Sequence, residues 1–458
     1  MNNGNIKIVN FEMLHITSCE YEKNINSYGM AKIKGYIDEK DYEECKRKAY
    51  SGECFVVEEI IDSNSQVIFL GIVKSVSFYC DKGYNVNMVL QGELSKLNLC
   101  VNNRIFQNDN NSLDDMISKI AETNEVQYRV RNLGTTNISH MVVQYEESDW
   151  DFLIRIIKEV GGCLIPDYKG EGCRFFIGLK EGEKEILSSE KYVINSLYHE
   201  YEKKVENGIK QVIDDQFEYV IKADKYFELG DAVEFNGKFL YVYRIVGKWE
   251  GQELIHHYVL RTKGAFKQLS IQNYNLSGVT FSAKVSKINH DKIEVSFDDV
   301  EAYGSREYIY STVYSSVNGA GWYCMPEVDD KVTITFATQN PESAYASGAV
   351  HLSMGEKDSD TKFIRNPYDK EIRFTKDELK ITNNRGTEII LNDTNGLTLT
   401  SAGAINITAE KDITISSTEE RITLQGETGV ELKQSDSKVI VNGDVMLIGE
   451  QIHIQNVE

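Results

Sequence analysis

Residues 388–424, EIILNDTNGLTLTSAGAINITAEKDITISSTEERITL, contain the pattern that predicts the fold of the C-terminal part. Pairs of apolar residues with one residue between their two members recur in it at intervals of 8 or 9 residues, and Gly, Asn, Asp, Ser, Glu and Lys lie between the pairs. With the preceding Leu379/Ile381, which lies 10 positions earlier, the series comprises eight pairs. The other seven are Ile389/Leu391, Leu397/Leu399, Ile405/Ile407, Ile413/Ile415, Ile422/Leu424, Val430/Leu432 and Val439/Val441. The repeat predicts short strands with one apolar face, joined by polar turns.

Two apolar side chains per strand cannot close a core within one chain. If three chains wind together, each supplies one wall of a three-sided prism, the apolar pairs point to a shared axis, and strand edges pair with neighbouring chains. A single-chain β-solenoid or a meander is the alternative, but eight residues are few for a coil that turns three corners. Residues 366–458 are therefore predicted to form an intertwined trimeric β-helix (a β-prism), with the seven pairs from Ile389 to Val441 as its trimer core.

The N-terminal part, residues 1–268, mixes strands with two amphipathic helices. The first helix is predicted to begin after Ser112, since Leu113, Met116, Ile117 and Ile120 form an apolar stripe and Ser112 can cap the helix. The second is predicted to begin after Ser148, with its stripe at Trp150, Leu153, Ile154 and Ile157. Both stripes are interpreted as core. The fold class is mainly β with a few α-helices.

Residues 274–353 show period-two alternation over short segments, as at Val279, Phe281, Ala283 and Val285 and again at Val332, Ile334 and Phe336. Turns are predicted at His290-Asp291 and at Asp329-Asp330. Short alternating strands separated by turns indicate a small β-barrel.

Composition excludes several classes of function. The net charge is −21, from 50 Lys and Arg against 71 Asp and Glu, and a chain this acidic repels nucleic acid. We expect no signal peptide at the N-terminus and no membrane-spanning helix, because no window approaches 18 apolar residues. The eight cysteines form no CxxC pair, which fits reduced thiols in a protein made in the cytoplasm.

Motifs that carry catalysis or bind cofactors are not found. The sequence has no G-x-S-x-G, H-E-x-x-H, P-loop or G-x-G-x-x-G pattern. His256 and His257 are neighbours on a predicted strand, so they point to opposite faces and cannot chelate one metal together. His453 lies between Ile452 and Ile454, and three copies near a trimer axis could hold a metal, but strand alternation favours an outward-facing side chain. We expect no enzyme activity, no cofactor and no metal.

Four stretches in order resemble the VgrG family, the hub–spike proteins of type VI secretion and related contractile systems. The most specific is VQYEESDWDFLIRIIKEVG at residues 143–161, a strand end, an acidic turn and a helix with Phe-Leu-x-Arg. The others are FLGIV at residues 69–73, LNLCVNNRIFQN at residues 97–108 and GWYCMPEVDDKVTITF at residues 321–336. Trp322 stands alone where family barrels often carry a second tryptophan, and we expect no lysozyme-like insert and no effector domain.

The resemblance implies a structural role for each segment. Residues 1–268 would form a phage-hub-like domain of β-barrels (late control gene D type) that meets a hexameric inner tube and the baseplate. Residues 274–353 would be an OB-fold barrel at the neck, and residues 366–458 the spike that pierces the target envelope when the sheath contracts. A PAAR-type tip protein would complete a homotrimeric particle that is assembled in the baseplate and released outside the cell. A tail-associated cell-wall hydrolase and a β-helical receptor-binding adhesin are the alternatives.

Overall fold

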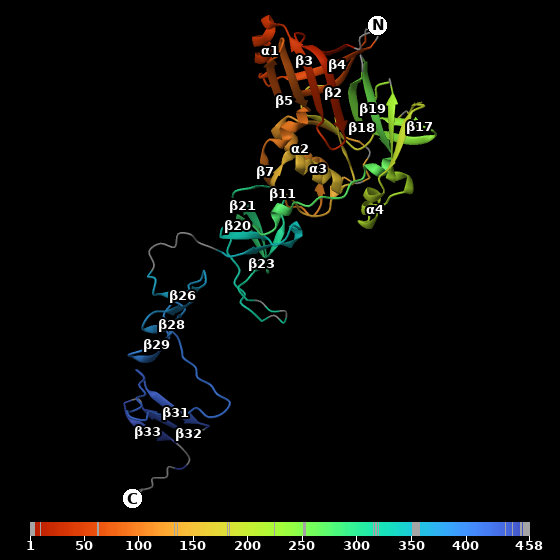
Figure 1. The fold of residues 1–458 in the computed structure, drawn as a ribbon. Helices are drawn as coiled ribbons and strands as arrows, with labels where there is room; N and C mark the ends of the chain where they lie inside the picture. The colour runs from red at the N-terminus through yellow and green to blue at the C-terminus, as the bar shows by residue number, and fades with distance from the viewer. Residues whose placement is uncertain are drawn as a thin grey trace. The chain divides into compact units, whose positions relative to one another are not determined.

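The chain folds into two units, Met1–Leu352 and Ser353–Glu458, in the computed structural model shown in Figure 1. The structure describes residues 5–9, 11–61, 64–131, 133–134, 136–180, 182, 184–223, 225–250, 253–314, 316, 318, 320–349, 358–435, 437–441, 443–448 and 451. His453 lies outside the described residues, so its predicted outward orientation stays a prediction.

A twelve-stranded sheet forms the framework of the first unit. Ten strands lie in the spatial order β1 (Asn5–Ile8), β4 (Cys54–Ile61), β5 (Asn64–Cys80), β6 (Tyr84–Gln91), β3 (Met30–Ile37), β2 (His15–Asn24), β18 (Lys238–Glu250), β19 (Glu253–Arg261), β16 (Phe217–Ala223) and β15 (Tyr192–Ser196). β17 (Ala232–Phe235) pairs with β18 and with β14 (Glu185–Ile186). Alternating side chains of these strands enclose one apolar core, to which Ile33, Val57 and Leu260 belong.

The two predicted helices are confirmed as α2 (Leu113–Asn124) and α3 (Asp149–Glu159). Ser112 caps α2 by accepting a hydrogen bond from the backbone N–H of Asp115, and Ser148 caps α3 in the same way from Asp151. Each predicted apolar stripe is buried in a second core. Small sheets surround them: β8 (Asn111–Ser112) with β10 (Asn137–Ile138), and β9 (Gln127–Val130) with β12 (Leu164–Pro166) and β13 (Arg174–Ile177). The other helices are α1 (Tyr42–Ala49) and α4 (Tyr198–Glu206).

The predicted small barrel is confirmed as a closed barrel of five strands. Its strands are β20 (Val279–Asn289), β21 (Lys292–Phe297), β23 (Glu307–Ser311), β25 (Ala344–Ser347) and β24 (Lys331–Phe336). The turns fall where they were predicted, and His290 and Asp329 adopt positive φ angles of 55° and 72° there. The fold class, mainly β with a few helices, is also confirmed.

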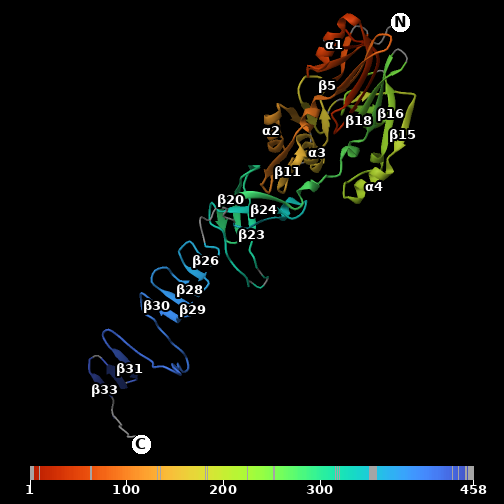
Figure 2. The same cartoon turned by 60° about the vertical axis from the view of Figure 1, so that its left-hand side comes forward.

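The second unit contains two antiparallel meanders (Figure 2). The first joins β26 (Lys362–Arg365), β27 (Glu371–Phe374), β28 (Glu378–Thr382), β29 (Glu388–Asn392) and β30 (Gly396–Thr400), and the second joins β31 (Val430–Gln434), β32 (Ser437–Val441) and β33 (Val445–Ile448). The structure differs here from the expectation that strand edges pair with other chains, because these strands pair within the chain. Residues 401–429 contain no strand, which also differs from the expected strand at every apolar pair.

Candidate functional site: the junction between the hub and the barrel

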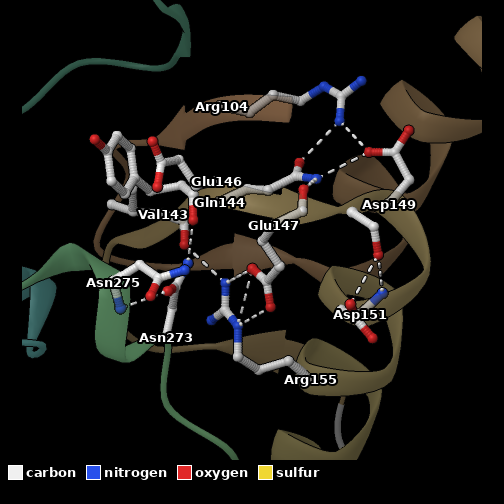
Figure 3. Close-up of polar contacts among 12 residues, drawn as sticks. Arg104, Val143, Gln144, Glu146, Glu147, Asp149, Asp151, Arg155, Asn273 and Asn275 are labelled. Atoms are coloured by element: carbon white, nitrogen blue, oxygen red, sulfur yellow. Dashed lines mark hydrogen bonds and ion pairs between the residues drawn. The ribbon is translucent and has the colours of Figure 1, made fainter. Parts of the chain in front are cut away.

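A buried ion pair organises the segment that carries the most specific sequence motif. Arg104 lies on β7 (Val101–Phe106) and Asp149 opens helix α3; the guanidinium of Arg104 donates hydrogen bonds to Asp149 and to Oε1 of Gln144, the latter at 2.8 Å. Nε2 of Gln144 in turn donates to Asp149 Oδ1 at 2.9 Å, as Figure 3 shows. All three side chains are buried. Because each charge has a partner, the group is stable inside the protein and fixes α3 against β7.

A second arginine ties the same helix to β11 (Val142–Ser148). Nε of Arg155 donates to Oε1 of Glu147 at 2.9 Å, and Nη2 donates to Glu147 Oε2 and to the carbonyl of Val143, both at 2.7 Å (Figure 3). The β11 ladder has an irregularity between Gln144 and Glu147, where Glu146 adopts a φ of 44°. This bulge turns Glu147 toward α3, so the acidic turn of the motif positions a partner for its arginine.

The barrel is attached to the hub through the same two strands. β22 (Glu301–Tyr303), between two barrel strands in the chain, pairs in parallel with β7. Nδ2 of Asn273 donates to the carbonyl of Tyr145 at 2.8 Å (Figure 3). Ile105 and Val143 belong to the same apolar core as the barrel residues. The hub and the barrel therefore share one continuous core at this junction.

Polar side chains close the rim of the junction. The backbone N–H of Met141 donates to Glu342 at 2.9 Å, and Arg306 pairs with the same carboxylate. The hydrogen bond from Arg306 holds the pKa of Glu342 below its ordinary value. His140, the neighbour of Met141, forms a hydrogen bond with Glu159 of α3, which raises the pKa of the imidazole. At the junction, Arg306 thus stabilises the charged carboxylate of Glu342, and Glu159 stabilises the charged imidazolium of His140.

A buried polar network inside the large sheet was not predicted from the sequence. Lys23 is fully buried, and its amine donates to the hydroxyl of Tyr226 at 2.6 Å. Burial lowers the pKa of Lys23. His256 bridges the hydroxyl of Tyr21 at 2.7 Å and Glu59 at 2.8 Å. These partners are about two hundred residues apart in the chain, so no local motif could have revealed them.

His256 and His257 behave as predicted, because His256 is buried and His257 lies on the other face of β19. In the described part of the chain, no group of three or more His, Cys, Asp or Glu side chains is arranged to hold a metal ion. The helices of that part include none with both the length and the apolar character needed to cross a bilayer.

The structure brings some of the predicted trimer-core residues together and leaves others apart. Within the first meander, Leu391 lies opposite both Leu379 and Leu397, and Ile389 opposite Leu399. Within the second, Val430 lies opposite Val441 and Leu432 opposite Val439. The remaining predicted core residues, Ile405, Ile407, Ile413, Ile415, Ile422 and Leu424, lie in residues 401–429 outside any strand, and all six are exposed.

Comparison with known proteins defines the class. Residues 46–171 match the family described as phage tail baseplate hub (GPD), and residues 282–351 match the type VI secretion system/phage-baseplate injector OB domain. The first match includes Arg104, Asp149 and Arg155, and the second covers most of the closed barrel. The chain thus contains one segment similar to the phage tail baseplate hub and one similar to the injector OB domain. A search of curated protein sequences found no match.

Three solved structures resemble this chain in fold. The E. coli c3393 protein, described as a component of the type VI secretion system that resembles the T4 bacteriophage tail proteins gp27 and gp5, matches with a TM-score of 0.54 at 14% identity, over 76% of this chain and 100% of that one. A chain of the half-lidded PdpA–VgrG complex from Francisella matches with a TM-score of 0.54 at 11% identity, over 86% of this chain and 87% of that one. The lidless PdpA–VgrG complex gives 0.55 at 12% identity, over 86% and 97%. The resemblance to the VgrG family is confirmed, and a structural hub or spike role is supported.

Proposed function

We propose that this chain is the homotrimeric hub and spike of a contractile injection system, and that it works mechanically and not as an enzyme. Its hub end caps a hexameric inner tube and contacts the baseplate. Its C-terminal unit breaches the target envelope when the sheath contracts, and it carries a PAAR-type tip protein or a cargo. The chain is made in the cytoplasm, assembled into the particle and released with it. The two matched domains support this proposal at the level of the class.

The main support for the proposed trimer is the uncovered apolar face of the second unit. Cross-strand pairing aligns Leu379, Leu391 and Leu397 in one row across β28, β29 and β30. Leu391 is 47% exposed and Leu397 is 63% exposed. A ladder of leucines in water is unfavourable, at roughly 25 cal/mol for each Å² of apolar surface. Three copies, each contributing its meander as one wall, would enclose these rows around a common axis.

The junction supports the mechanical part of the proposal. A spike driven from its hub must pass force through the link between the hub and the barrel. Here that link consists of a shared core and a parallel strand pair. Within the hub, Arg104 and Arg155 hold the strands that carry the link, β7 and β11, to helix α3 through bonds to Asp149 and Glu147. Side chains packed at crystal-like density yield little under load, so the junction is suited to move as one body.

Light scattering on the purified full-length chain tests the proposal. We expect a mass of three times 52.2 kDa. A monomer of 52.2 kDa at micromolar concentration would refute the trimer. Zymography on cell-wall preparations separates the spike from a tail-associated hydrolase, since the proposal expects no clearing. Binding of the second unit to intact target cells without a sheath would instead favour a receptor-binding adhesin.

A further inference from the structure

Most of β23 and the segment that follows it toward β24 differ in composition from the rest of the acidic chain. Residues 308–326, YIYSTVYSSVNGAGWYCMP, contain no charged side chain in 19 positions, although 26% of the whole chain is charged. We name residues 312–326 the neutral loop. Its described residues, 312–314, 316, 318 and 320–326, extend away from the closed barrel in Figures 1 and 2. A long loop on the surface of a protein normally carries charged side chains, so a different selection acts on this one.

The neutral loop presents large apolar side chains to solvent. Val313 is 91% exposed, Tyr323 is 74% exposed and Trp322 is 64% exposed, and Tyr314 is exposed as well. Scattered single apolar residues on a surface are ordinary, but four in one uncharged loop form a patch. Trp and Tyr are also the residues that contribute most to protein interfaces.

Hydrogen bonds join described residues of the loop to one another and to the barrel, while the apolar side chains named above are exposed. The backbone N–H of Trp322 donates to the carbonyl of Tyr314 at 2.9 Å, and the backbone N–H of Ser316 donates to the carbonyl of Ala320 at 2.8 Å. The hydroxyl of Tyr323 donates to the carbonyl of His290, in a turn of the barrel, at 2.8 Å. A loop fixed in this way loses little conformational entropy when a partner covers it.

We infer that the neutral loop of each copy docks on the barrel of the next copy, so that three such contacts join the three barrels into a ring. This inference rests on the proposed trimer and names a contact within it. Copies that each carry a charge of −21 repel one another. A contact between them therefore requires a surface free of carboxylates, and the neutral loop provides one. The barrel offers an apolar counterpart, because Ile309 and Val328 are exposed.

The exposed side chains set the area that such a contact can bury. Full burial of an aromatic side chain removes about 150–250 Å² from water, and Tyr314, Trp322 and Tyr323 are 55%, 64% and 74% exposed. The three would therefore bury about 400 Å², and an equal area on the partner gives about 800 Å², so the contact adds to a trimer that the second unit also holds together. A head-to-tail contact of this kind closes into a ring when it repeats by a threefold rotation.

Photo-crosslinking in the full-length protein tests the docking. A benzophenone amino acid replaces Val313 in one sample and Lys287 in the control, since Lys287 lies exposed on β20 of the same barrel. Chains labelled with ¹⁴N and ¹⁵N are mixed, unfolded and reassembled, and mass spectrometry then separates crosslinks between copies from those within one copy. We expect mixed-isotope crosslinks from position 313 to the barrel of another copy, and none from position 287.

Each other outcome overturns the inference. Crosslinks from position 313 that stay within one copy, in a sample that light scattering shows to be trimeric, refute the docking and leave the proposed function intact. A monomeric sample refutes both. If vesicles of phosphatidylcholine and phosphatidylglycerol are added and position 313 crosslinks to lipid in place of protein, the neutral loop contacts membranes and the inferred docking between copies is wrong.

Discussion

The face assignment in the second unit can be tested with two neighbouring residues of β30. Leu399 lies opposite Ile389, and its side chain shares a face with Leu397. Thr398 lies between these leucines in the chain and opposite Ile390, so its side chain points to the other face. Leu399→Asp and Thr398→Asp therefore introduce the same charge at neighbouring positions of β30, on opposite faces of the sheet. Only the first enters the proposed trimer core.

The magnitude of the effect depends on whether that face is covered. Leu399 is 52% exposed in the single chain. Full burial of a leucine contributes about 1.5–3 kcal/mol, so its loss from a half-covered position lowers stability by about 1 kcal/mol. In a trimer, each copy would lose a buried leucine at roughly 2–5 kcal/mol and leave a polar group unpaired at about 2 kcal/mol or more. Over three copies the penalty reaches about 12 kcal/mol, comparable with the whole stability of a domain.

The assay is the detergent concentration or temperature at which the full-length assembly dissociates, followed by light scattering. We expect Leu399→Asp to abolish the trimer or to lower its dissociation temperature by tens of degrees. Thr398→Asp, an exposed substitution, should change stability by about 0.5 kcal/mol or less. If both variants dissociate under the same conditions, or if Thr398→Asp is the more damaging, the assignment of faces is wrong. If Leu399→Asp lowers stability by only about 1 kcal/mol, the face is uncovered in solution.

Three further outcomes are expected at the junction. Arg104→Met should destabilise the first unit by about 3–5 kcal/mol in chemical denaturation, because the carboxylate of Asp149 stays buried without its cation; a loss below about 1 kcal/mol would contradict this account. Ser148→Ala should lower stability by about 1 kcal/mol through loss of the helix cap, with wild-type spectra as the check on folding. The hydrogen bond to Glu159 raises the pKa of His140, so the pair stabilises the folded state when His140 is protonated. This stabilisation is fully present below the ordinary pKa of 6.5 and is lost as the pH rises through the raised pKa. Unfolding measured from pH 5 to pH 9 should show that loss, and His140→Gln should remove the pH dependence.

Local features of the fold could be predicted because their causes lie within a few residues. The helices that follow Ser112 and Ser148 were predictable because an N-cap and an apolar stripe are both short-range patterns. The turn at His290 was predicted from the polar residues between two alternating strands. The contacts that join the hub to the barrel could not be predicted in this way. Met141 and Glu342, for example, are separated by 201 positions, and nothing in either neighbourhood specifies the other.

The apolar repeat shows both what a periodic pattern determines and what it leaves open. The spacing of Ile389 and Leu391 correctly predicted that the two side chains share a face, and the register with β28 and β30 aligns that face across the sheet. The same spacing did not determine where each strand finds its hydrogen-bond partner. An eight- or nine-residue unit leaves enough chain for a tight turn, so neighbouring units can pair within one chain as a meander. Pairing within the chain satisfies the backbone of the inner strands, yet it adds no cover to the leucine rows. In the proposed trimer, the need for further copies therefore arises from the uncovered face and not from the strand edges, so we expect substitutions on that face, and not in the turns, to prevent assembly.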